Sequence, residues 1–458
     1  MTLPFKTPSP KPPRVIRLGR RATHIRMALK LSTLTGVRRA FWIAGFQFLA
    51  LGGAVAVFGV DDASRAVVLP AGALSCLHGA PEGQIAILAC SPECAAIPWQ
   101  LDERDPGGRY VLDSGPAASS DVDGGAVDDN DDVVFMWSDA GGARTAPLPG
   151  TPACVHAVEI EVGPLRRWVY AARYARATPR SMVRYVEYDV AADVMRGRSV
   201  EITFAGPTPR GLALRAGPMA GRSLLDRLKV RASARFFGIF PLSRDEDDIS
   251  SIYEAWRVGP VRVLRRERKW VHLAFGYRTP YLDTETTFYR DFVQLPVRMR
   301  LNFAPAQLLS HIQVRAALDF VDLRGWRFAA PGALQPFAVG DGAGQSQRGA
   351  IDAGADAEVI ALQGPDATFA LVLRLGPTLR SISKNIVYEE APNADAPERV
   401  AGQMPAIGFR LTDWGDVERG EHWFVAESYA LPANYDLDAF AAGLAVEPGF
   451  TVTVDSSN

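Results

Sequence analysis

The sequence has 458 residues, of which 48% are hydrophobic and 22% charged, and this is typical of a globular protein with two or three domains. Residues 1–56 hold ten of the 50 basic residues and none of the 51 acidic ones, so the remainder has 40 basic against 51 acidic residues, a net charge of −11. This acidic remainder argues against nucleic acid and anionic membranes as partners, because both are bound by clustered Lys and Arg.

Residues 1–56 have the pattern of a signal peptide. A basic region ends at Arg38-Arg39, an apolar core follows, and Ala54-Val55-Ala56 offers a small-x-small cleavage site. The arginine pair is compatible with the Tat route as well as the Sec route, so we predict a secreted protein, periplasmic or extracellular. The alternative is an uncleaved membrane anchor, because residues 40–60 are long enough to span a bilayer. That segment is the one membrane contact we predict.

All four cysteines lie in about the first hundred residues after the predicted cleavage site. An even number of cysteines in an exported protein predicts two disulfides, with three pairings open. The alternative is a zinc site in which this group acts with His78 and His156. The four residues are Cys76, Cys90, Cys94 and Cys154.

An acidic segment spans residues 121–132 and contains six carboxylates. These charges repel one another unless water or a cation surrounds them, and Ca²⁺ binds six to eight oxygens from flexible loops. The alternative is a solvated turn whose Asp and Asn side chains cap the strand predicted at residues 133–137. The predicted calcium ligands are Asp121, Asp123, Asp128, Asp129 and Asp131.

Two motifs lie near this acidic segment. Ile-Pro-Trp-Gln-Leu-Asp-Glu precedes it at residues 97–103, and Asn-Asp-Asp-Val-Val-Phe-Met overlaps its end at 130–136 and is followed by Asp-Ala-Gly at 139–141. They resemble a group of exported bacterial β-rich proteins that carry Pro-x-Gln-x-Asp-Glu and then Asn-Asp-Glu-x-Val-Phe-Met. The likeness covers about forty residues, and Asp132 stands where the group has Glu. The resemblance implies a secreted β-sandwich, and it assigns no activity or catalytic residue.

Alternating polarity dominates the rest of the chain, and its period of two is that of half-buried strands. Gly-Pro pairs separate many of these segments, so we predict an all-β fold, an antiparallel β-sandwich that could be a supersandwich, with few short helices. One helix is expected at residues 436–444, with Asp436 as its N-cap, and residues 304–318 are ambiguous. The predicted strands are 155–162, 168–174, 182–190, 199–204, 228–236, 258–264, 297–303 and 369–375.

We predict breaks where Pro, Gly and small residues accumulate, near residues 145–152 and 331–355. Beyond the signal segment, 1–56, they divide the chain into three regions. These are an N-terminal β domain with the cysteines and the acidic loop, a central β-sandwich, and a C-terminal β region packed on the central one: residues 57–150, 151–335 and 336–458.

Basic and aromatic residues at positions 259–270 form a candidate ligand site. Arginines bind carboxylates and sulfates in a bidentate manner, and an indole can stack on a sugar ring. The alternative is a solvated strand face paired with the acidic residues 245–248. The predicted ligand-binding residues are Arg262, Arg265, Trp270 and Arg290.

Tyr281, Asp283 and Glu285 form the best candidate for catalysis, because the two carboxylates of a strand at this spacing share one face. A tyrosine or carboxylate base beside an arginine suits a polysaccharide lyase, and paired carboxylates suit a glycoside hydrolase. The alternative is ordinary cross-strand pairing on a sheet.

Two classes of function follow. The first is an exported, non-catalytic binding or structural envelope protein, with a polysaccharide or another envelope protein as partner and Ca²⁺ as its one candidate cofactor. The second is a lyase or hydrolase acting on an acidic polysaccharide. An enzyme requires a deep cleft around Asp283 and Glu285, whereas a carbohydrate-binding protein would present a flat face lined with aromatic residues. The sequence has no Gly-x-Ser-x-Gly, P-loop or dinucleotide-binding motif.

Overall fold

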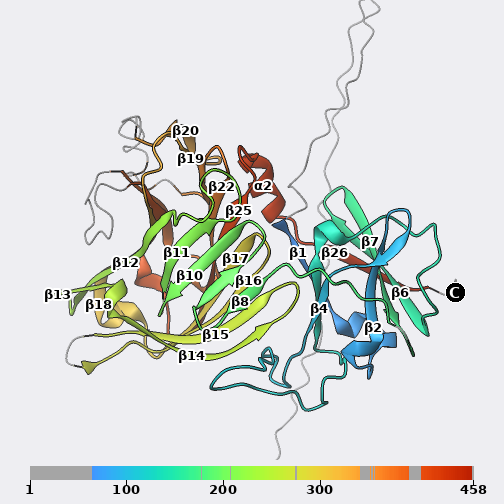
Figure 1. Cartoon of the computed structure of the whole chain (residues 1–458). Helices are drawn as coiled ribbons and strands as arrows, with labels where there is room; N and C mark the ends of the chain where they lie inside the picture. Colours follow the sequence, from blue (N-terminus) through green and yellow to red (C-terminus); the bar gives the residue numbers. More distant parts are fainter. Residues whose placement is uncertain are drawn as a thin grey trace, which may run out of the picture. The chain divides into compact units, whose positions relative to one another are not determined.

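Antiparallel strands dominate the chain (Figure 1). The structure is a computed structural model that describes residues 64–176, 178–206, 208–273, 276–340, 351, 354, 356–390 and 404–455. The predicted signal segment, residues 1–56, lies outside them, and residues 57–458 form one compact unit. In the described parts, no helix has the length and apolar character needed to cross a membrane. The predicted all-β sandwich is confirmed.

Two small sheets pack together near the N-terminus. Their facing side chains, among them Val67, Leu101, Phe135, Ile87 and Val158, form one buried core. The last strand comes from the C-terminal end of the chain and pairs with β6. The first sheet has the order β1 (Ala66–Pro70), β5 (Asp132–Met136) and β4 (Trp99–Asp102). The second has the order β26 (Gly449–Val454), β6 (Cys154–Val162), β7 (Leu165–Arg173), β2 (Ile85–Cys90) and β3 (Cys94–Ala96).

A nine-stranded sheet is the largest element of the fold. Its order is β14 (Ile249–Val258), β15 (Val263–Val271), β16 (Leu282–Phe288), β17 (Phe292–Leu301), β25 (Gly420–Leu431), β22 (Thr368–Leu375), β21 (Val359–Gln363), β19 (Arg327–Ala330) and β20 (Leu334–Ala338).

Two further sheets share a core with the nine-stranded sheet, formed by side chains such as Phe288, Phe320, Phe369, Phe409 and Ile202. One has the order β13 (Phe240–Asp245), β12 (Leu225–Phe236), β18 (Leu309–Phe320), β24 (Ala406–Thr412) and β23 (Ser383–Glu389). The other has the order β11 (Thr208–Leu214), β10 (Val200–Ala205), β9 (Val194–Arg196) and β8 (Glu187–Asp189).

Strand β5 connects the small and large parts of the fold. Successive side chains of a strand point to opposite faces, and all five residues of β5 are buried. Val133 and Phe135 belong to the small core, whereas Val134 and Met136 pack with Tyr289 and other residues on the second face of the nine-stranded sheet. A continuous apolar run is therefore required here, because both faces of β5 are covered.

The α-helix α2 (Leu437–Leu444) confirms the predicted helix, and Asp436 caps it by accepting a hydrogen bond from the Ala439 N–H at 2.9 Å. Leu437 and Phe440 are its buried residues and belong to the same cluster as Met136. Single turns of 3₁₀-helix occur at Ala71–Ala73, Ser75–Leu77, Glu82–Gln84, Trp137–Asp139, Glu246–Asp248, Pro305–Gln307, Pro377–Leu379 and Trp414–Asp416.

Three predicted elements differ from the structure. The strand expected at 258–264 is two strands, because β14 ends at Val258, the chain turns, and β15 begins at Val263. Of the strand expected at 182–190, only β8 forms. The ambiguous segment 304–318 is a 3₁₀ turn followed by β18, as its β-branched residues favour.

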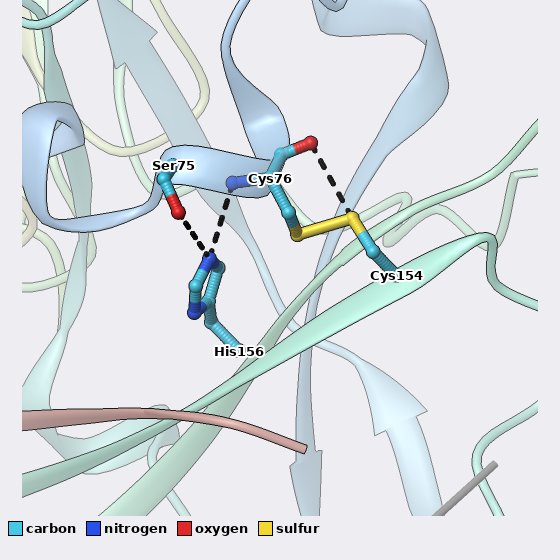
Figure 2. Close-up of a disulfide and its surroundings, with 4 residues drawn as sticks. All are labelled: Ser75, Cys76, Cys154 and His156. Atoms are coloured by element: carbon cyan, nitrogen blue, oxygen red, sulfur yellow. Dashed lines mark hydrogen bonds between the residues drawn. A yellow bond between two sulfur atoms is a disulfide. The ribbon is translucent and has the colours of Figure 1, made fainter. Parts of the chain in front are cut away.

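The cysteines form two disulfides, Cys76–Cys154 and Cys90–Cys94, which confirms that prediction and removes the cysteine-based zinc site. Figure 2 shows His156 beside the first disulfide. The Cys76 N–H donates to Nε2 of His156 at 3.1 Å, and the Ser75 Oγ lies 3.5 Å from the same nitrogen. The lone pair on Nε2 is therefore already used, and burial lowers the pKa of this histidine. Ser75 and His156 are thus a structural contact rather than a nucleophile and its base.

Candidate functional site

The basic stretch of the sequence divides between two faces of β15. Arg265 and Glu267 point into the sandwich, whereas Arg266, Arg268 and Trp270 lie on the opposite face. This division follows from the period of two along a strand. Among the predicted ligand residues, Trp270 lies on the outward face, and Arg262, Arg265 and Arg290 are buried.

A row of exposed side chains crosses four neighbouring strands and the edge strand β14. The register pairs each member with the next, from β14 through β15, β16 and β17 to β25. Adjacent strands lie about 4.8 Å apart, so the row spans roughly 19 Å across the sheet. We call it the outer row; it consists of Ile252, Arg268, Asp283, Arg298 and Trp423.

Beside the outer row lies an aromatic–arginine cluster formed by Trp270, Arg278 and Tyr281. The two rings meet edge to face with centroids 5.8 Å apart. The Arg278 guanidinium carbon lies 4.7 Å from the Tyr281 centroid and 5.5 Å from that of Trp270, and Arg268 approaches Tyr281 from 5.0 Å. Among the described residues, Arg278 has no carboxylate partner. The cluster therefore combines stacking surfaces with an available positive charge.

Asp283 and Glu285 lie on one face of β16, and each is held by an arginine of β15. Arg268 donates to Asp283 at 3.2 Å and also binds Glu254 at 2.8 Å. Arg266 binds Glu285 at 2.6 Å. The cross-strand geometry is that expected of ordinary sheet pairing.

This arrangement limits what the two carboxylates can do. A glycoside hydrolase places its carboxylates on either side of the scissile bond, whereas Asp283 and Glu285 project from one side of one strand. The small cavity found among the described residues lies inside the large sandwich, and neither carboxylate lines it.

Arg262 lies at the junction between β4 and the turn before β15. It is 3% exposed, its Nε donates to Asp102 at 2.7 Å, and its Nη1 donates to the Tyr289 hydroxyl at 2.7 Å. Burial alone would lower the pKa of Arg262, but Asp102, Tyr289 and Tyr110 together outweigh burial and the pKa is raised. Gln100 completes the junction, since its Oε1 accepts from the N–H groups of Val261 and Arg262.

Asp132, from the second motif, forms another ion pair close to that of Arg262 and Asp102. Asp132 accepts from Arg104 at 2.7 Å and from the Tyr110 hydroxyl at 2.8 Å, and burial raises the pKa of this tyrosine. Arg262 and Arg104 both lie over the Tyr110 ring. Gln100, Asp102 and Asp132, from the motifs at residues 97–103 and 130–136, are therefore part of this connection. We call it the arginine junction; it consists of Gln100, Asp102, Arg104, Tyr110, Asp132, Arg262 and Tyr289.

The other two buried arginines among the predicted ligand residues, Arg265 and Arg290, are also in ion pairs. Arg265 binds Asp193 at 2.6 Å and contacts Glu267 within the sandwich. Arg290 binds the adjacent Asp291 at 2.6 Å. Their burial places both away from the outer row.

The acidic loop brings three of its five predicted ligands together. Asp121, Asp123 and Asp128 each place a carboxylate oxygen within 4.8 Å of the others. Asp129 instead contacts His78 at 3.1 Å. Asp131 is buried and accepts from the N–H groups of Arg104 and Asp128.

The charges of this loop are poorly compensated. Burial raises the pKa of Asp131 to about 6, with Asp128 and Asp123 adding to the rise. Burial also raises the pKa of Glu103, and Asp131, Asp121 and Asp123 contribute in the same direction. A cation would relieve this repulsion.

Sequence reasoning missed several residues of these sites. Arg298 and Trp423 join the exposed face through strand register, which the local pattern does not reveal. Arg278 comes from the connection between β15 and β16. The predicted site residues do not include Gln100, Asp102 or Tyr110, although the first two lie in the motif at residues 97–103. The available signal was the alternation within this motif, which places the polar residues Gln100 and Asp102 on the same face of a strand.

No family model matches the chain, and no curated protein matches it. Among solved structures, one titled "PPLO at 1.23 Angstroms" is similar over 84% of this chain and 76% of that chain, with 8% identity and a TM-score of 0.23. A likeness at that level carries no argument about function.

Proposed function

We propose that this chain is an exported, non-catalytic binding protein whose outer row and aromatic–arginine cluster bind an acidic glycan. The observation that carries the proposal is the half-buried Trp270–Tyr281 pair with the exposed Arg278 beside it. Arginine binds carboxylates and sulfates, and aromatic rings stack on sugar faces. The outer row offers a third aromatic ring, Trp423, that is 44% exposed.

A binding role fits these residues better than catalysis. A general acid or base needs a proton that can be exchanged with substrate, whereas Asp283 and Glu285 are each bound to an arginine in the free protein. An open sheet face does not exclude water from a reacting bond. The same surface can hold a polymer that lies across the strands.

The experiment measures binding of the exported form to polygalacturonate, a sulfated glycan and neutral dextran by isothermal titration calorimetry. Trp270→Ala and Tyr281→Ala should each weaken binding to the acidic polymers at least tenfold. Arg278→Ala should weaken acidic binding and leave any dextran binding unchanged. Phe450→Ala is the matched control, because Phe450 is an exposed aromatic residue of β26.

Two results would overturn the proposal. The first is acidic-glycan binding that persists in the Trp270→Ala and Tyr281→Ala variants. The second is release of unsaturated or reducing ends that Asp283→Asn or Glu285→Gln abolishes, since that outcome assigns a lyase or hydrolase.

Calcium remains the proposed ion of the acidic loop. The three clustered carboxylates supply oxygen ligands of the kind Ca²⁺ prefers. Titration with Ca²⁺ should therefore show binding that Asp123→Asn weakens. Asp129→Asn is the matched control, because Asp129 points to His78. Equal loss in both variants, or no binding in the wild type, would remove the proposal.

A further inference from the structure

The tip of the β12–β13 hairpin is apolar and exposed. Phe236 and Phe240 are cross-strand partners, and the turn between them is Phe237-Gly238-Ile239. The exposed fractions are 40% for Phe236, 61% for Phe237, 71% for Ile239 and 62% for Phe240. At roughly 200 Å² per phenylalanine, the three phenylalanines of the hairpin alone expose on the order of 300 Å², which is within the size range of a functional patch on a monomer.

The turn itself does not explain these side chains. Phe237 has φ of 51° and Gly238 has φ of 72°. Bulky residues rarely adopt this left-handed conformation, and Gly or Asn would suit position 237 without strain. The backbone is nevertheless well held, because the Phe237 N–H donates to the Leu308 carbonyl at 2.8 Å and Phe236 pairs with Leu309. The hairpin therefore presents a rigid phenylalanine tip at a local conformational cost.

Charge at this end of the sandwich differs from the rest of the chain. Residues 232–243 contain one charged side chain, Arg235, and residues 302–314 contain no Asp, Glu, Lys or Arg. Arg235 is exposed and directly precedes the phenylalanines. The excess of acidic residues that argues against anionic membranes is therefore not found in the hairpin. The one charged residue there, Arg235, can pair with lipid phosphate.

The edge of the sheet is unsuited to a second copy. β13 is an edge strand, and edge strands can recruit another chain through their free N–H and C=O groups. Pro241 lies at the start of this strand and has no N–H to donate. A protruding apolar tip beside a blocked edge suits insertion into an interface better than strand pairing.

We propose that the hairpin tip, residues 235–240, inserts into the lipid–water interface of a phospholipid membrane. Apolar and aromatic side chains enter the boundary between headgroups and acyl chains, and the flanking arginine stays at the phosphates. This contact is separate from residues 40–60 and from the proposed glycan surface.

The test places a fluorescent probe at the tip of the full chain. All four cysteines are in disulfides, so Ile239→Cys introduces a single free thiol for the environment-sensitive dye NBD. With vesicles of phosphatidylethanolamine and phosphatidylglycerol, NBD emission at position 239 should rise at least twofold and shift to the blue. Met182→Cys is the matched control, because Met182 is 91% exposed and its neighbours Arg180 and Arg184 contact Gly83 and Gly259 rather than the hairpin. Emission at position 182 should not change.

A local probe separates tip insertion from any binding by residues 40–60. Adding Phe237→Ser and Phe240→Ser to the labelled variant should abolish the emission change while near-ultraviolet circular dichroism stays unchanged. Unchanged emission at 239 on vesicles that bind the protein would overturn the proposal, and so would equal changes at 182. A change that grows with protein concentration without vesicles would instead assign the tip to a second copy of the chain.

Discussion

Arg262 and Arg268 come from the same basic stretch of the sequence but occupy opposite environments. The Arg262 side chain is 4% exposed and binds Asp102, which is 160 residues away in the chain. The Arg268 side chain is 38% exposed and binds Asp283 and Glu254 on the neighbouring strands. One arginine connects two parts of the fold, and the other belongs to an open surface.

The difference shows that residue type alone does not locate a ligand site. A buried arginine that is bound to a carboxylate and a hydroxyl inside the protein is out of reach of a ligand in solution, so it offers little to one. An exposed arginine loses little when it exchanges a surface carboxylate for a ligand, because surface pairs contribute roughly 0–1 kcal/mol. Burial and partners therefore decide which arginines can bind.

The largest expected effect is that of Arg262→Ala. Removing Arg262 leaves the buried Asp102 carboxylate with only the longer ion-pair contact to Arg257 at 3.7 Å. Because breaking a buried ion pair is costly, the free energy of unfolding should fall by about 3–5 kcal/mol. Urea denaturation of the exported form measures it. The double variant Arg262→Met with Asp102→Leu should lose less than Arg262→Ala alone. A loss below about 1 kcal/mol for Arg262→Ala would mean that the junction does not stabilise the fold.

Gly259→Ala is the next largest change. A Cβ at this position would lie 1.7 Å from Oε1 of Gln100. Gln100 would have to move and give up its bonds to Val261 and Arg262, and overpacking of this kind costs about 1–3 kcal/mol. Gly415→Ala is the matched control because its Cβ would meet nothing within 4 Å. Equal stability of the two variants would contradict the close contact.

Much of the fold could be predicted because strand alternation is a local property. The segments at β6, β10, β12 and β22 show the pattern over most of their lengths, and α2 carries its own cap residue. The turn at 259–262 was missed because Val258, Val261 and Val263 continue an apolar pattern through it. The turn begins at the Gly259-Pro260 pair, and Gln100, from a distant part of the chain, holds it by accepting hydrogen bonds from the Val261 and Arg262 N–H groups.

The sites were harder to predict for the same reason. Alternation places Arg265 and Arg266 on opposite faces, but it does not say which face another sheet covers. The pairing of Asp283 with Arg268 depends on the register of two strands, and that of Arg298 with Trp423 on a strand more than 100 residues later. The acidic loop was easier, because three of its five predicted ligands lie within eight residues of one another.

The acidic loop extends the comparison to carboxylates that lack arginine partners. The pKa of Asp131 is raised to about 6 in the folded protein, above the value of about 3.9 for an unfolded aspartate. Its stabilising contribution is therefore fully present below about pH 4 and is lost as the pH rises through 6. The stability of the wild type relative to Asp131→Asn should fall across this window and stay constant above it. Urea midpoints from pH 3.5 to 8 measure the difference, and a flat difference would contradict the raised pKa.

The smallest expected effect on stability is that of Arg268→Ala. Its pairs with Asp283 and Glu254 are partly exposed, so the free energy of unfolding should change by less than about 1 kcal/mol, and by less still in high salt. Urea denaturation at low and high salt checks this result beside Arg262→Ala. If Arg268→Ala proved as damaging as Arg262→Ala, the outer row would be part of the structural framework. A small effect on stability with a clear loss of acidic-glycan binding would instead separate the two arginines by role, one holding the fold and the other serving the surface.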